Sequence, residues 1–454
     1  MNKNSLRTED RAIHSWYRFV LAYPPHLVRE YLEKFRADPE RDWVFDPFSG
    51  TATTPLEARL NGFSVIGTDA NPVAVLANQV KLNWEIDLEL VKAQLEDVVQ
   101  TATDAMRTVG LEPAFQREQQ LALFDDVSSP NTLFGLIADR RNDNNGDFDP
   151  DKLLDENAQK VLPTGFISPL PLKRVLAIRY AIEKYIAYPE VRDFFRLALA
   201  NTILSTAGNV AFGPEIYATR PKEDAPVLLT FYETVHRMIG HVRELVSNQT
   251  MTGPSFYVAR DDARKLAVLA DLPPIGVVIT SPPYPNEKDY TRTTRLENVL
   301  LGYIQSPHDL RDLKERLLRS NTRNVFVNDH DDQYIRDIPA IIHLAQKIEN
   351  RRLELGKTSG FEKLYHRVTT LYFGGMYRHL QQLFPRLRPG GRCAYVVGDQ
   401  MSFFRILIPT AHLLADVALK VGYQVEGIEI WRNRFSTTTH KNIEKNVLIL
   451  KKPE

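Results

Sequence analysis

Residues 42–82 read DWVFDPFSGTATTPLEARLNGFSVIGTDANPVAVLANQVKL. Two apolar runs in this stretch, at 42–48 and 63–69, are rich in β-branched residues, and both predict strands. Each run is followed by a segment with the residue spacing of a helix, at 54–60 and 72–82. Because strands alternate with helices here, we expect a mostly parallel sheet that helices cover on both faces.

The same pattern returns later in the chain, where a helix is expected at 406–421. No helix separates the last two strand candidates, which predicts an antiparallel hairpin at one edge of the sheet. The expected fold class is α/β and Rossmann-like, with a seven-stranded, mostly parallel sheet, an antiparallel edge hairpin and two largely helical inserts. The further strand candidates lie at 255–262, 276–283, 392–399, 423–431 and 446–452.

Two long stretches, 85–253 and 285–371, interrupt the alternation of strands and helices. The first insert begins as a helix, contains the polar segment RRNDNNGDFDPD at 140–151, and returns to helix-forming sequence. We expect the polar segment to be a solvated loop. The second insert is charged and mainly helical by pattern. The α/β domain is accordingly expected in three pieces, at 1–84, 254–284 and 372–454.

The composition, 43% hydrophobic and 25% charged over 454 residues, is that of an ordinary globular protein. Its 57 basic and 57 acidic residues balance, so a nucleic acid would have to be bound by a local basic groove. Cys393 is the single cysteine, which excludes disulfides and thiolate zinc sites, and no metal is expected. The sequence has no signal-peptide pattern and no apolar run of about 18 residues, so we expect a cytoplasmic protein without a membrane partner.

The first expected strand ends in Asp46, and the chain then runs through Gly50 into a helix. A glycine after a strand lets the backbone turn tightly and approach a ligand, and the N-terminus of the next helix offers free amide donors. The second expected strand ends at Asp69, and Pro72 begins the helix that follows. An acidic side chain at this place in an α/β sheet can accept hydrogen bonds from both hydroxyls of a ribose. Asp69 is equally compatible with a helix N-cap.

The segment Thr280-Ser281-Pro282-Pro283-Tyr284 ends an apolar strand candidate. Consecutive prolines fix φ and favour extended geometry in the preceding residue, so the segment predicts a stiff ledge at the carboxyl edge of the sheet. Open α/β sheets bind their ligands at that edge. The Ser281 hydroxyl and the Pro282 carbonyl can then face one amino group, while Tyr284 offers a flat aromatic face. Taken alone, the segment is also compatible with an ordinary loop that ends a strand.

In this order, DPFSGTATT, the strand-end Asp69 and TSPPY resemble motifs I, II and IV of the DNA amino-methyltransferases, the N4-cytosine and N6-adenine DNA methylases. The resemblance implies a Rossmann-like fold that binds S-adenosylmethionine. It covers about half of the chain and leaves the two inserts unexplained. Further similar segments are 14–17 with the helix 24–35, which resemble motif X, then 261–266, which resembles motif III, and the continuation at 289–290, 295–297 and 301–303.

The resemblance also implies which residues bind S-adenosylmethionine. Asp69 is expected on the ribose, and Asp262 is expected at the adenine amino group, with Asp261 as a near-equal alternative. Tyr17 or His14 is expected at the methionine end. The full set expected at the cofactor is Tyr17, Asp46, Phe48, Gly50, Thr51, Asp69 and Asp262.

Catalysis is expected from Ser281, Pro282, Pro283 and Tyr284. An exocyclic amine of cytosine or adenine is conjugated into its ring and is a poor nucleophile, so the site has to favour the form with a free lone pair. Hydrogen bonds from the amine to the ledge strengthen as positive charge develops on it. Duplex DNA hides this amine, so the base must be extruded, and Tyr284 is expected to stack on it. Carbon-5 methylation needs a thiolate, and Cys393 lies inside an apolar strand, which excludes that chemistry.

Double-stranded DNA is the expected partner, and a cognate restriction enzyme or another defence-system protein is a further candidate. Sequence recognition is expected in the two inserts, because no separate region follows the last strand. The candidate phosphate contacts, each equally compatible with a solvated surface charge, are Arg220, Lys222, Arg292, Arg295, Arg432 and Arg434, the last two before 437–439.

Three other functions stay open: an RNA amino-methyltransferase, a protein-glutamine methyltransferase, and a non-catalytic DNA-binding subunit on a methylase scaffold. The protein-glutamine enzymes normally show Asn-Pro-Pro-Tyr, no RNA-binding module is recognisable, and both sets of motifs are intact. In the family, Ser-Pro-Pro-Tyr is associated mainly with N4-cytosine enzymes, which favours cytosine over the alternative, N6 of adenine. Ser281 alone does not set the ring size, so we expect a wall opposite Tyr284, supplied by the inserts, to decide.

Overall fold

The computed structural model of the chain describes residues 6–19, 22–112, 148–213, 215–247, 253–286, 288–436 and 441–454. Most of the polar segment expected as a loop at 140–151, up to position 147, lies outside the described residues. The other regions singled out in the sequence are nearly all described.

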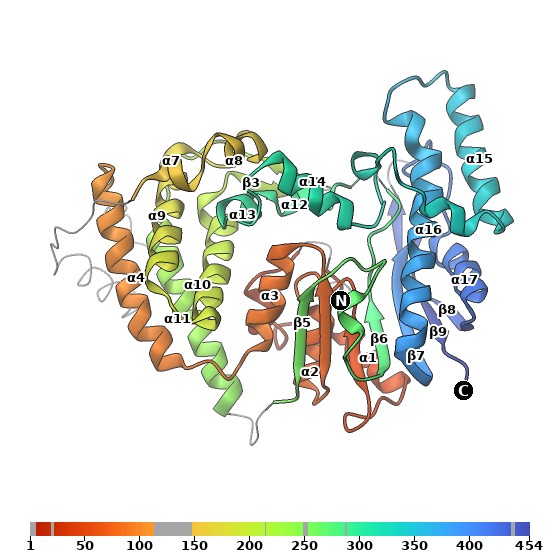
Figure 1. Cartoon of the computed structure of the whole chain (residues 1–454), viewed down its shortest axis with the longest axis horizontal. Helices are drawn as coiled ribbons and strands as arrows, with labels where there is room; N and C mark the ends of the chain where they lie inside the picture. The colour runs from red at the N-terminus through yellow and green to blue at the C-terminus, as the bar shows by residue number, and fades with distance from the viewer. Residues whose placement is uncertain are drawn as a thin grey trace.

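A seven-stranded sheet organises the fold, with its strands in the order β5-β2-β1-β6-β7-β9-β8 (Figure 1). The first five strands of this order are parallel, and β9 and β8 form an antiparallel hairpin at one edge. The structure therefore confirms the expected fold class, and each of the seven strand candidates is a strand of this sheet. Their bounds are β1 Trp43–Asp46, β2 Val65–Asp69, β5 Phe256–Arg260, β6 Ile275–Thr280, β7 Leu387–Gly398, β8 Gln424–Ser436 and β9 Lys441–Lys451.

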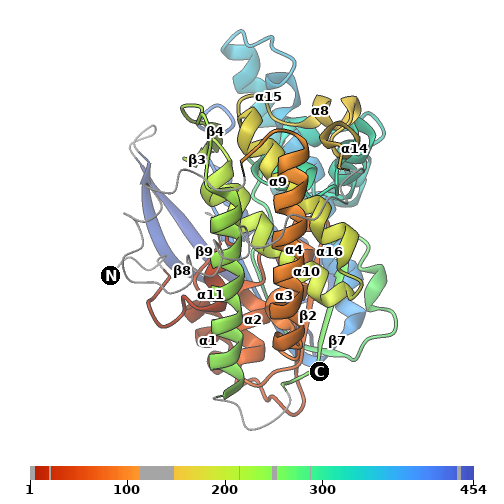
Figure 2. The same cartoon turned by 90° about the vertical axis from the view of Figure 1, so that its left-hand side faces the viewer.

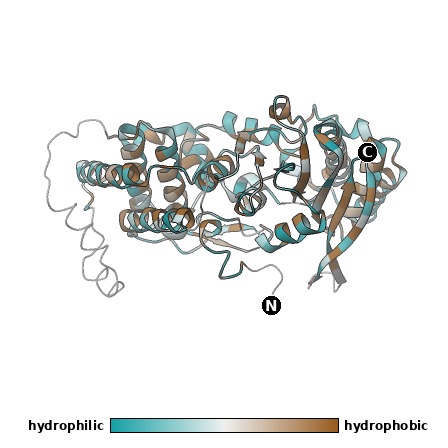
Figure 3. Cartoon of the chain, turned by 90° about the horizontal axis from the view of Figure 1, so that it is seen from below, coloured by the Kyte–Doolittle hydropathy of each residue, from teal (hydrophilic) through white to brown (hydrophobic). Residues whose placement is uncertain are grey.

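Successive strand residues point to opposite faces of the sheet and enter two different cores. Val44 and Val65 lie in the core that includes α1, α2 and α3. The next residues, Phe45 and Ile66, lie in the core that includes α16 and α17. Figure 3 shows the result, with apolar residues on the strands and on the inner faces of the helices. The bounds are α1 Pro25–Lys34, α2 Thr53–Leu60, α3 Pro72–Leu82, α16 Tyr365–Leu383 and α17 Thr410–Val421.

The first insert forms a helical bundle beside the sheet, and its long helices run alongside one another (Figure 2). It also contains a short antiparallel hairpin, β3 and β4, that the sequence pattern did not reveal. A π-helical turn, Ile203–Ala207, ends α10 just before this hairpin. The bounds are α4 Leu88–Thr108, α7 Pro150–Leu153, α8 Glu156–Val161, α9 Pro169–Tyr185, α10 Pro189–Thr202, β3 Val210–Phe212, β4 Ile216–Ala218 and α11 Val227–Ser247.

The second insert is helical, as expected, and its first helices lie above the carboxyl ends of the parallel strands in Figure 1. Its bounds are α12 Tyr290–Thr293, α13 Arg295–Leu300, α14 Pro307–Arg316 and α15 Pro339–Glu354. The expected boundary at 371 falls within α16, which packs on the sheet. Among the described helices, none is long and apolar enough to cross a membrane.

The helix expected at 406–421 starts later than predicted, because α17 begins only at Thr410. Ile408 instead pairs with Gln400 in an antiparallel bridge, and Pro409 precedes the helix. Proline lacks a backbone donor and is tolerated at the start of a helix but not in its interior. The apolar residues at 406–408 therefore fit the spacing of the helix but lie before its first turn.

Candidate active site

A cavity of about 820 Å³ lies at the carboxyl ends of the parallel strands. The loops that follow five strands line it, together with residues of both inserts. Open α/β sheets bind ligands at this edge because loops from neighbouring strands meet there. The cavity brings the two predicted halves of the site together: Phe48, Gly50, Thr51 and Asp69 on one side, and Ser281, Pro282, Pro283 and Tyr284 on the other.

The loop after β1 turns through a left-handed backbone at Gly50, where φ is +49°. The Gly50 amide donates to the Asp69 carboxylate over 2.9 Å, and the Gly50 carbonyl accepts from Asn78. Ala52 also has a positive φ, 70°, although its Cβ makes this conformation unfavourable by about 1 kcal/mol. The surrounding contacts therefore hold the loop in a shape that presents its backbone to the cavity.

Asp69 joins this loop to the end of β2. One carboxylate oxygen accepts from the Gly50 amide and the other accepts from the Asn71 amide, each over 2.9 Å. The N-cap of α3 is Asn71, whose side chain accepts from Val73, so the N-cap role considered for Asp69 belongs to its neighbour. Burial raises the pKa of Asp69, and the backbone hydrogen bonds oppose that shift. Asp69 forms part of the cavity lining, and each of its oxygens can accept one further hydrogen bond.

Asp46 lies beneath the loop, with 1% of its surface exposed, and is not among the residues that line the cavity. Its carboxylate accepts from the Thr280 hydroxyl at 2.5 Å, from the Tyr23 hydroxyl at 2.9 Å and from the Phe48 amide at 3.1 Å. Burial raises the pKa of Asp46 to about 7 although these donors lower it. Asp46 thus fixes the N-terminal segment, the β1 loop and the base of the ledge to one another, and it acts as a positioning residue.

The two adjacent acids after β5 have different surroundings. Asp262 accepts two hydrogen bonds from the Arg264 guanidinium, at 2.9 and 2.8 Å, and does not line the cavity. Arg264 is held in turn by Asp331. Asp261 lines the cavity, and burial raises its pKa. We therefore assign the proposed contact with the adenine amino group to Asp261 in place of Asp262.

The N-terminal segment reaches the cavity through residues other than those expected. Tyr17 is buried and donates to Glu297 over 2.5 Å, and His14 is paired with Glu57 at 3.0 Å. Neither lines the cavity. Phe19, two residues beyond Tyr17, does line it, and its ring lies 3.6 Å from the position that a Cβ at Gly50 would occupy. The segment contributes an aromatic wall, and Tyr17 supports it from behind with an edge-to-face contact.

Lys81 is a buried residue that the sequence analysis missed. Its ammonium donates to the carbonyl oxygens of Tyr17 at 2.5 Å, Thr51 at 2.8 Å and His14 at 3.3 Å. Burial lowers its pKa to about 7. A lysine on a helix whose other residues are almost all apolar was the available signal. Lys81 ties the N-terminal segment to the β1 loop from below.

The Lys81→Met variant should lose about 3 kcal/mol of unfolding free energy, because three buried carbonyl groups lose their donor while the aliphatic volume is kept. Urea unfolding measures this change. Lys92→Met is the matched control, since Lys92 pairs with Glu89 on the surface, and we expect a change below about 1 kcal/mol there. Equal stability of the two variants would show that Lys81 does not hold the loop.

At the ledge, the Ser281 hydroxyl donates to the Val396 carbonyl over 2.9 Å and lies 3.2 Å from the Tyr284 hydroxyl. Because its proton is engaged by a main-chain carbonyl, the oxygen can offer a lone pair to a ligand. The Tyr284 ring lies against Gly398, where a Cβ would be 3.3 Å from the ring. The glycine at the end of β7 thus lets the ring pack against the backbone.

The basic residues proposed for phosphate contacts fall into two groups. Lys222 and Arg295 have internal partners: Lys222 donates to the Thr206 and Gly208 carbonyls, and Arg295 pairs with Asp289. Arg220 is exposed, Arg292 pairs with Glu215 at 3.8 Å, and Arg432 lines the cavity. The Arg434 side chain and residues 437–439 lie outside the described part of the chain. Further basic residues that line the cavity are Lys288, Arg316 and Lys445.

Comparison with known proteins finds no matching family model. The type II methyltransferase M.BsoBI of Geobacillus stearothermophilus is 21% identical over 472 residues, 98% of this chain and 86% of that protein. M.AvaI of Nostoc sp. (strain PCC 7120) is 27% identical over 187 residues, 39% of this chain and 38% of that protein. M.MvaI of Kocuria varians is 30% identical over 69 residues, 15% of either chain. Among solved structures, TrmN from Thermus thermophilus is a weak match, with a TM-score of 0.27 and 12% identity over 94% of this chain and 48% of its own.

Proposed function

We propose that this chain, which is similar over 98% of its length to a type II methyltransferase, is an S-adenosylmethionine-dependent DNA methyltransferase that acts on N4 of cytosine. N6 of adenine is the alternative target. The observation that supports this proposal best is the single cavity that joins the Gly50 and Asp69 loop to the ledge from Ser281 to Tyr284. A cognate restriction enzyme that acts at the same DNA sequence is the proposed partner in the cell.

The residues around the first half of the cavity fit S-adenosylmethionine. The volume of the whole cavity, about 820 Å³, is within the range of small-molecule sites. Gly50 brings backbone close to the cavity, Asp69 offers acceptors to ribose hydroxyls, and Asp261 can accept from the adenine amine. Phe19 and Phe48 supply apolar walls. When bound, the cofactor supplies a methyl group on a positively charged sulfur.

The second half of the cavity fits an amino group on a flat ring. Ser281 is oriented as an acceptor by its own hydrogen bond to Val396, and the Pro282 carbonyl is the second proposed acceptor. Both acceptors bind the amine more strongly as it becomes positive, so they stabilise the transition state more than the bound base. Tyr284 is the proposed stacking surface for the extruded base.

Residues of both inserts complete the cavity. Ile216 comes from the first insert, and Thr291 and Leu317 come from the second. These residues are the proposed wall that limits the size of the base and thus separates cytosine from adenine. RNA amino-methylation uses the same chemistry, so the nature of the substrate has to be measured directly.

The expected product is N4-methyldeoxycytidine. Plasmid DNA from cells that express the chain should contain it at one short sequence, found by single-molecule sequencing, and digestion to nucleosides with mass spectrometry identifies the modified base. N6-methyldeoxyadenosine as the sole product would reject cytosine and keep the rest of the proposal. Transfer of labelled methyl groups to RNA or protein but not to DNA would reject a DNA methyltransferase.

A further inference from the structure

We propose that Phe212, at the tip of the β3–β4 hairpin, enters the base stack of duplex DNA and fills the space that the extruded target base leaves. This inference rests on the proposed function, because it requires a DNA base to be taken into the cavity. It assigns to the first insert a role in opening the duplex.

The register of the hairpin places its residues on two distinct faces. Phe212 pairs with Ile216, and Ala211 pairs with Tyr217. Since neighbouring residues of a strand point to opposite faces, Phe212 and Ile216 share one face, and both line the cavity. Tyr217 belongs to the other face. Phe212 is 38% exposed, so its ring lies at the rim and not on the floor of the cavity.

The hairpin is anchored more firmly than its length suggests. A two-stranded hairpin alone is marginally stable. Here, buried Asn209 at the base of the hairpin donates to the Ser168 hydroxyl over 2.9 Å and accepts from the Lys222 amide over 3.0 Å. The Lys222 ammonium donates to the Gly208 carbonyl over 2.8 Å. At the tip, Glu215 pairs with Arg292 of α12, close to the ledge. These contacts hold the hairpin in place, so we expect Phe212 to keep its position when a DNA duplex binds.

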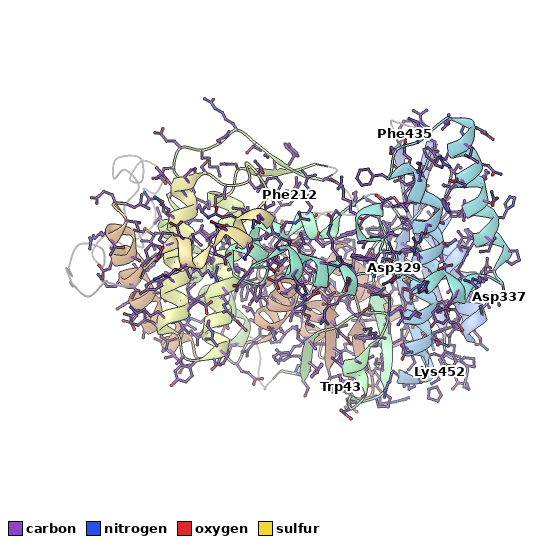
Figure 4. All side chains as sticks on the ribbon, turned by 45° about the horizontal axis from the view of Figure 1, so that its top comes forward. Trp43, Phe212, Asp329, Asp337, Phe435 and Lys452 are labelled. Atoms are coloured by element: carbon purple, nitrogen blue, oxygen red, sulfur yellow. The ribbon has the colours of Figure 1, made fainter. Side chains whose placement is uncertain are left out.

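The cavity lining around the hairpin contains basic residues that phosphates can contact, together with acidic ones such as Glu215, Asp399 and Glu444. Lys288, Arg316, Arg432 and Lys445 line the same cavity, which extends to the β8–β9 hairpin. Figure 4 labels Phe212 in the upper half of the view, near its middle, and Phe435, which lies near the tip of the β8–β9 hairpin, at the upper right. A duplex laid across the mouth between the two hairpins would meet basic residues with its phosphates. Apolar side chains that enter base steps are known devices for opening a duplex.

The test compares the Phe212→Ala variant with the wild type on two oligonucleotides. One is a duplex with the sequence found by methylome sequencing, and the other carries a mismatch opposite the target base, so that extrusion costs less. We expect the variant to methylate the matched duplex at least about tenfold more slowly, and the mismatched duplex within about twofold of the wild type. Phe212→Trp should retain activity on both, and Tyr217→Ala, on the other face, should behave as the wild type.

Two outcomes would overturn the inference while leaving the proposed function in place. A wild-type methylation rate for Phe212→Ala on the matched duplex would show that the Phe212 ring does not help to open the duplex. An equal loss on both oligonucleotides, with unchanged cofactor affinity by calorimetry, would make Phe212 a wall of the base pocket. If the wild-type protein methylated neither DNA, the proposed function itself would fail, and the inference would fail with it.

Discussion

The Ser281→Ala variant should transfer methyl groups about 100- to 1000-fold more slowly than the wild type while binding S-adenosylmethionine with unchanged affinity. Loss of one preorganised polar group that stabilises developing charge has an effect of about this size in other enzymes. In this chain the Ser281 proton is engaged by the Val396 carbonyl, so the variant removes an oriented acceptor. The Tyr284 hydroxyl, 3.5 Å from the same carbonyl, remains as a donor, and the ledge should keep its shape.

The matched control for this prediction is Ser402→Ala, which removes a hydroxyl from another residue that lines the cavity. Single-turnover methylation measures the chemical step, and calorimetry measures cofactor binding. We expect Ser402→Ala to leave both unchanged within about twofold. A wild-type rate for Ser281→Ala would place the acceptor of the amine elsewhere, and a loss of cofactor affinity would make Ser281 a structural residue of the loop.

The Asp69→Ala variant should bind S-adenosylmethionine at least about 100-fold more weakly, since two hydrogen bonds from ribose to a charged acceptor contribute about 3 kcal/mol together. The structure adds a second consequence. Asp69 also accepts from the Gly50 and Asn71 amides, so the variant should unfold more easily by about 1 to 3 kcal/mol. Calorimetry of the cofactor and urea unfolding measure the two effects separately.

Asp69→Asn separates these two roles. The amide oxygen can still accept from one of the backbone amides, so stability should recover in part, whereas the loss of charge should keep the cofactor affinity well below that of the wild type. Wild-type affinity for the cofactor in either variant would remove Asp69 from the proposed site. Normal stability with weak binding in Asp69→Ala would show that the β1 loop does not depend on this carboxylate.

The sequence predicted the seven strands of the sheet because each contains an apolar run rich in β-branched or aromatic residues. The β3–β4 hairpin was missed because each strand has only three residues, fewer than a period-2 pattern needs to be visible. The sequence analysis therefore did not identify Phe212 as a residue of the site, and the structure did. The same limit applies to the wall of the cavity, which side chains from both inserts build through contacts between distant segments.

The individual site residues show a different limit of sequence-based prediction. Asp261 and Asp262 are adjacent acids, and what distinguishes them is that Asp262 pairs with Arg264 whereas Asp261 lines the cavity. Tyr17 belongs to a segment that reaches the cavity, but its hydroxyl bonds to Glu297, a partner 280 positions away in the chain. Such pairings depend on how the inserts fold back on the sheet. A motif can therefore name the right segment and still leave the contacting side chain undecided by one or two residues.

The order of the strands has a consequence for the synthesis of the protein. β1 and β2 leave the ribosome early, but their outer neighbours β6 and β5 follow only after roughly 190 further residues. At about 5 to 20 residues per second, the pair waits on the order of 10 to 40 s with both edges open. Unpaired apolar strand edges promote association between chains, while the helices of the first insert can fold from local contacts in the meantime. The yield of folded protein should thus depend on the speed of translation between these strands and on chaperones that cover them.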